Sequence, residues 1–149
     1  MNAKLQCNHG ERPMPLLSWS DKYSVGIPEF DNQHKRLIDL INSLHEAMST
    51  GRGNAVLDKV LADLITYTQT HFAAEERFMQ SHQFGEFAAH KVEHEKLTKR
   101  VLDFQQQFRA GKLALSISLM RFLETWLTSH IMDSDRKYGV CLESLLTAR

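Results

Sequence analysis

Apolar side chains recur every three or four residues along most of this chain, the spacing that places them on one face of an α-helix. The pattern predicts four amphipathic helices, over residues 31–48, 54–78, 87–108 and 114–135. Asp31 and Asn54 are residue types that cap helix N-termini, so we expect them to begin the first two helices. A last short helical turn is expected over 138–146.

The breaks between the predicted helices are short. Glycines interrupt the pattern near Gly51 and Gly111, and residues 81–85 leave room for a turn and no more. No segment shows the alternation of a half-buried strand with a partner strand elsewhere in the chain. The sequence therefore predicts an all-α, up-down-up-down antiparallel four-helix bundle.

The N-terminal part of the chain lacks this periodicity. Residues 1–17 show no regular pattern, and we expect an irregular N-terminal extension. Residues 19–30 hold aromatic and β-branched side chains interrupted by Gly26 and Pro28, which indicates an extended strap. The helical domain is thus expected to occupy residues 18–149.

Composition narrows the function classes. The 149 residues include 18 basic and 18 acidic side chains, so no positive excess favours nucleic acid or anionic lipid. No apolar run approaches the roughly 20 residues that cross a bilayer, and the first 17 residues lack a signal-peptide core. Cys7 and Cys141 form no paired motif. We expect a cytoplasmic, monomeric protein without membrane insertion.

Polar residues interrupt the apolar stripes at matching depths. His71 with Glu75, and His90 with His94, are each four residues apart, which places each pair on one helical face. In an antiparallel bundle the start of one helix lies beside the end of the next. All seven candidate ligands should therefore meet at one end of the bundle: His34, His71, Glu75, His90, His94, His130 and Asp135.

A metal site explains these interruptions better than chance. A single histidine on an apolar stripe is more often a hydrogen-bonded core residue, and single pairs also occur on helix surfaces. Seven buried polar side chains at one depth are harder to stabilise, since each unpaired one costs a few kcal/mol. Seven ligands exceed the need of one ion, and this donor set favours iron, manganese or zinc over magnesium or calcium. A dinuclear iron centre with bridging carboxylates fits best.

Four segments resemble the hemerythrin family: SVGIPEFDNQHKRLIDLIN, HFAAEERFM, HKVEH and WLTSHIMDSDRKY, together spanning about Trp19 to Tyr138. The family includes a four-helix bundle of the myohemerythrin type. The resemblance implies two iron ions joined by an oxo or hydroxo bridge. By the family pattern, His90, His94 and His130 bind one iron, His34 and His71 bind the other, and Glu75 and Asp135 bridge both.

The resemblance also implies reversible binding of dioxygen at the vacant position of the two-histidine iron, without catalysis. It implies an apolar pocket there, formed by Leu37, Phe72, Trp126, Leu127 and Ile131. A diiron oxygen or redox sensor, and an enzyme that scavenges nitric oxide or peroxide, are the alternatives. Ferritin-like diiron enzymes use mostly glutamate ligands, whereas this chain offers five histidines and two carboxylates. Oxygen storage, delivery or buffering is therefore favoured.

Overall fold

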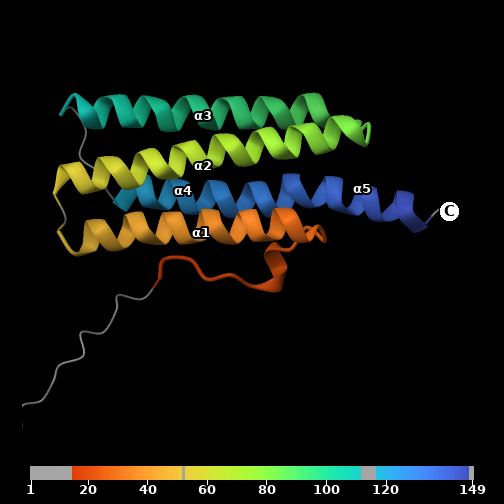
Figure 1. Cartoon of the computed structure of the whole chain (residues 1–149), viewed down its shortest axis with the longest axis horizontal. Coiled ribbons are helices and arrows are strands. Elements are labelled where there is room, and N and C mark those ends of the chain that lie inside the picture. The colour runs from red at the N-terminus through yellow and green to blue at the C-terminus, as the bar shows by residue number, and fades with distance from the viewer. Residues whose placement is uncertain (1–14, 52, 112–116, 148–149) are drawn as a thin grey trace, which may run out of the picture.

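Four long antiparallel helices form the molecule in this computed structural model, which describes residues 15–51, 53–111 and 117–147 (Figure 1). They are α1 (Pro28–Ser49), α2 (Asn54–Ser81), α3 (Phe87–Arg109) and α4 (Ile117–Ser129). The last continues without a break through the π-helical segment η2 (His130–Asp135) into α5 (Arg136–Thr147). The described residues contain no strand, and the predicted all-α bundle is confirmed.

The predicted helix starts were wrong in detail. Helix α1 begins at Pro28, three residues before Asp31. Proline suits a first helical position, because the N–H that it lacks would have no partner within the helix there. Asp31 lies in the first turn and accepts hydrogen bonds from the backbone N–H of Val25 (2.8 Å) and the hydroxyl of Ser24 (2.6 Å). Asn54 is the first residue of α2, not its cap. The predicted start at position 114 lies outside the described residues.

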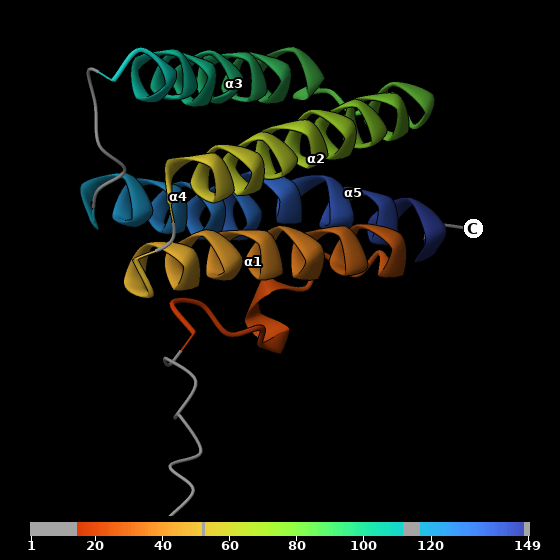
Figure 2. The same ribbon diagram turned by 60° about the vertical axis from the view of Figure 1, so that its left-hand side comes forward.

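The strap runs along α1 in both views (Figures 1 and 2). It contains a short 3₁₀ helix, η1 (Asp21–Tyr23), so it is not extended throughout. Leu17 is buried, and both its backbone N–H and its carbonyl bond to the side-chain amide of Asn42, at 2.9 and 2.8 Å. Farther along, the strap crosses α5 so closely that a Cβ on Gly139 would overlap the carbonyl oxygen of Val25. The strap therefore fixes the beginning of α1 against α5.

The apolar stripes of the helices meet in one core. Side chains from α1, α2, α3 and α4 fill it, including Leu37, Leu44, Leu61, Leu97 and Leu127. Helix α2 contacts both α1 and α3, and Figure 2 shows α3 next to α2. Within the described residues, no helix has the length together with the hydrophobicity that a bilayer crossing needs.

Candidate metal centre

Seven buried polar side chains lie together at one end of the bundle. They come from all four long helical runs, because α1 and α3 begin at this end while α2 and η2 end there. Every one is at most 4% exposed: His34, His71, Glu75, His90, His94, His130 and Asp135. The structure thus brings together all the residues that the sequence singled out as ligands. Their role as ligands stays a prediction at this point.

The seven form two overlapping groups, each with one donor atom per residue within 4.8 Å of the others. One group, here called the three-histidine set, contains His90, His94 and His130 with both carboxylates. The other, the two-histidine set, contains His34 and His71 with the same two carboxylates. Glu75 and Asp135 belong to both groups, which is the position of residues that bridge two ions.

Each shared carboxylate directs one oxygen toward each group. Glu75 Oε1 lies 3.5 Å from His34 Nε2 and contacts His71 Nε2, whereas Oε2 lies 3.6 Å from His90 Nε2. Asp135 Oδ2 lies 3.0 Å from His34 Nε2, whereas Oδ1 lies 2.9 Å from the Nε2 atoms of both His90 and His130. All these histidines present Nε2 to the interior, so their Nδ1 atoms face outward.

A local change of helix type brings the last two members into place. His130 and Asp135 are the first and last residues of η2, where the backbone follows a π-helix instead of an α-helix. Single π-turns inside α-helices occur often at functional sites. The sequence pattern gave the residue types here but not this helix type.

Without cations, the carboxylates hold protons on neighbouring histidines. Burial lowers the pKa of His34 and of His90, but the nearby carboxylates of Asp135 and Glu75 outweigh it and raise each pKa to about 9. Burial also lowers the pKa of His130, but the negative charge of Asp135 outweighs burial and raises this pKa to about 10. His94 is the exception, since burial dominates and lowers its pKa to about 3. The two buried carboxylates are therefore negatively charged, and protons on the neighbouring histidines compensate them.

The hydrogen bonding of the cluster is incomplete without an ion. Among the described residues, the buried side-chain atoms with no hydrogen-bond partner include Glu75 Oε2, both oxygens of Asp135 and His90 Nε2. Glu75 Oε2 and Asp135 Oδ1 lie within ion-pair distance of His90 Nε2, but these contacts lack hydrogen-bond geometry. Atoms that share a metal ion as ligands have this arrangement. Imidazole nitrogens with bridging carboxylates suit first-row transition ions. The residues present therefore fit two such ions.

Two further residues hold the candidate ligand histidines from outside, and the sequence analysis missed both. Gln33 Oε1 bonds to His71 Nδ1, and Glu93 Oε2 bonds to His130 Nδ1 at 3.0 Å. Each directly precedes a different candidate ligand in sequence, which turns it about 100° from that ligand and toward the neighbouring helix. That adjacency is the only sequence signal that could have identified them.

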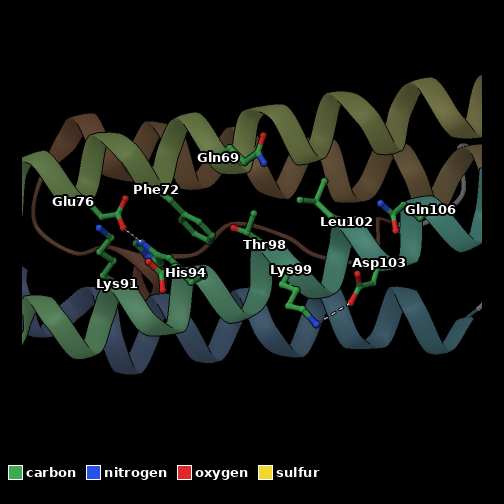
Figure 3. Close-up of a pocket in the computed structure, with 11 residues that line it drawn as sticks. Gln69, Phe72, Glu76, Lys91, His94, Thr98, Lys99, Leu102, Asp103 and Gln106 are labelled. Atoms are coloured by element: carbon green, nitrogen blue, oxygen red, sulfur yellow. Dashed lines mark ion pairs between the residues drawn. The ribbon is translucent and has the colours of Figure 1, made fainter.

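The expected pocket residues divide into two places. Leu37, Trp126 and Leu127 line an enclosed, largely apolar cavity of about 20 Å³ in the core. Phe72 instead stacks on His94, with ring centroids 3.8 Å apart, at the floor of an open groove of about 560 Å³ between α2 and α3 (Figure 3). Ile131 is buried but lines neither space.

Comparison with known proteins identifies a cation-binding family. The hemerythrin HHE cation binding domain matches residues 25–141. A bacteriohemerythrin of Methylococcus capsulatus is 37% identical over 132 residues, covering 88% of this chain and 100% of that protein. A bacteriohemerythrin of Stenotrophomonas maltophilia is 38% identical over 126 residues, 85% of this chain and 81% of that protein. A crystal structure of wild-type hemerythrin superposes with a TM-score of 0.81 at 38% identity, covering 85% of this chain and 98% of that one.

Proposed function

The chain belongs to the hemerythrin family and is an oxygen-binding protein with a non-haem diiron centre, and we propose that the seven converging side chains are the ligands of its two irons. The three-histidine set would hold one iron and the two-histidine set the other. Glu75 and Asp135 would bridge both. The observation that carries this proposal is the pair of shared carboxylates, each with one oxygen toward each set.

The two sets differ by one donor. The first offers three nitrogens and the second offers two, while each receives one oxygen from Glu75 and one from Asp135. An iron held by the three-histidine set would therefore have more of its positions filled by the protein, and one held by the two-histidine set would have room for a small ligand. When bound, the two irons would supply the electrons for reversible binding of dioxygen.

The protein's part is to hold the centre rigidly and to keep water away. The core beside the ligands is hydrocarbon, and the Thr68 hydroxyl in the cavity wall already donates to the carbonyl of Leu64 at 2.8 Å. A water molecule there would find few of the two to four polar partners that it needs. Leu37, Trp126 and Leu127 thereby form a dry wall, which slows the permanent oxidation that water and protons promote.

We assign the protein to storage, delivery or buffering of oxygen and not to catalysis, acting as a cytoplasmic monomer. The support is the donor set: oxygen-activating diiron enzymes of the ferritin-like type rely on glutamates, whereas five of the seven residues here are histidines. Size-exclusion chromatography with light scattering tests the monomer.

Metal analysis with visible spectroscopy tests the function. We expect about two irons per chain and an absorption band that air produces and argon removes over repeated cycles. One zinc per chain would overturn the diiron assignment. Conversion in air to a form that argon does not reverse would overturn carriage and favour an enzyme or a sensor.

A further inference from the structure

The outward nitrogens of the ligand histidines face different charges in the two sets. His130 Nδ1 donates to the Glu93 carboxylate at 3.0 Å, and the Ser134 hydroxyl donates to the same oxygen at 2.7 Å. His71 Nδ1 donates instead to the neutral amide oxygen of Gln33. Because Nε2 of both histidines faces the centre, Nδ1 is the nitrogen that carries the hydrogen.

A second carboxylate lies on the same side. Glu76 Oε1 is 3.8 Å from His94 Nδ1, a separation that a water molecule can bridge, and Figure 3 shows the two side chains facing each other in the groove between α2 and α3. Lys91 stands beside Glu76 and offsets part of its charge. Among the described residues, the only carboxylates within ion-pair distance of His34 and His71 are the shared ones.

The outer charges are therefore unequal. In the three-histidine set, the Glu93 carboxylate is hydrogen-bonded to His130 and the Glu76 carboxylate lies near His94. In the two-histidine set, the outer partner is the neutral amide of Gln33. A carboxylate that accepts a hydrogen bond from a ligand imidazole makes that imidazole a stronger donor. A stronger donor favours the ion of higher charge, which is ferric over ferrous iron.

We propose that Glu93 is a positioning residue that makes the iron of the three-histidine set the more easily oxidised of the two, with Gln33 as its neutral counterpart at the other iron. This inference rests on the proposed diiron function and adds an order of oxidation to it. The iron of the two-histidine set would then be the one that retains its electron longer. The hydroxyl of Ser134 fixes the Glu93 carboxylate against His130.

The size of the effect is limited by solvent. The Glu93 side chain is 50% exposed, so water screens its charge in part. Loss of such an outer partner typically changes metal affinity by 10- to 100-fold, and partial exposure favours the lower end. A tenfold change in the ferric-to-ferrous equilibrium at one iron equals 59 mV for one electron.

The test is a redox titration of the iron-loaded protein, in which each iron gives one electron to an added mediator. Glu93→Gln keeps an oxygen that accepts from His130 but removes the charge. We expect Glu93→Gln to raise the lower of the two midpoint potentials by about 59 mV, which corresponds to a tenfold change in the ferric-to-ferrous equilibrium. Gln33→Glu adds the charge at the other iron and should lower the higher potential. Glu46→Gln is the matched control, since Glu46 is exposed and twelve residues, or about 18 Å of helix, from His34.

A second variant separates the charge of Glu93 from its hydrogen bond. Glu93→Ala, which removes the hydrogen bond as well, should lose iron to a chelator about tenfold faster, whereas Glu93→Gln should retain its iron. If the role of Glu93 were purely structural, Glu93→Gln would leave the midpoint potentials unchanged. The proposal is overturned if Glu93→Gln shifts the lower potential no more than Glu46→Gln does, or if it shifts the higher one. A wild-type chain without two irons would overturn the proposed function together with this inference. Reversible oxygen binding with unmoved potentials would overturn the inference alone.

Discussion

Leu127 offers the sharpest test of the dry wall. It is 1% exposed, lies one helical turn before His130 and lines the cavity of about 20 Å³ with Leu37 and Trp126. That space is about large enough for one water molecule, but its wall is apolar, which keeps it dry. Leu127→Ala would enlarge the cavity beside the centre without adding a polar group.

The expected loss of stability follows from burial. Removing three buried carbons costs roughly 2.4 kcal/mol at about 0.8 kcal/mol each. If about 50 Å³ of cavity remains, it adds roughly 1.2 kcal/mol at about 24 cal/mol per Å³. The sum, between about 3 and 4 kcal/mol, lies inside the range of about 2–5 kcal/mol that buried leucine-to-alanine changes show.

Two measurements check this variant. Urea unfolding gives the loss of stability, and the decay of the air-induced absorption band gives the rate of permanent iron oxidation. We expect the band to decay faster, because the lost side chain no longer blocks the approach of water and protons to the site. Leu44→Ala is the control: Leu44 is fully buried, lies about 15 Å of helix from His34 and does not line the cavity. Equal decay rates in the two variants, or a loss below about 1 kcal/mol for Leu127→Ala, would refute the reasoning.

Three other changes have defined outcomes. In iron-free protein, His34, His90 and His130 have pKa values raised from 6.5 to about 9 or 10. The stability that they contribute is therefore present below pH 6.5 and lost as the pH rises through the raised values. Urea unfolding should show lower stability at pH 9.5 than at pH 6.5, and equal stability would contradict this prediction. Gly139→Ala should destabilise by about 1–3 kcal/mol and speed proteolysis within 15–27, because the new methyl group displaces the strap at Val25. Asn42→Ala should cost about 1–2 kcal/mol of unfolding free energy, because two hydrogen bonds to Leu17 are lost; no change would mean that water replaces them.

The bundle and the gathering of seven side chains at one end could be predicted because both depend on periodicity and helix direction. Helix starts could not, because residue type alone does not decide the cap: Asp31 bonds to the strap instead, through a contact that forms only in the fold. The outer partners Gln33 and Glu93 depend on how neighbouring helices are rotated against each other. The pocket was predicted as one space; in the structure Phe72 stacks on His94 and lines the groove between α2 and α3.

The spacing of His130 and Asp135 shows why the site needs a departure from regular helix. Five residues of α-helix turn about 500°, which would leave the two side chains about 140° apart around the axis. In a π-helix the hydrogen bonds join residues five positions apart, so the residue five positions on returns to nearly the same side of the helix. The segment η2 spans this interval, and both side chains reach the same centre, with Nε2 and Oδ1 2.9 Å apart. A wider turn costs hydrogen-bond quality, so we infer that the proposed bridging role of Asp135, rather than local helix propensity, maintains the π-helical segment.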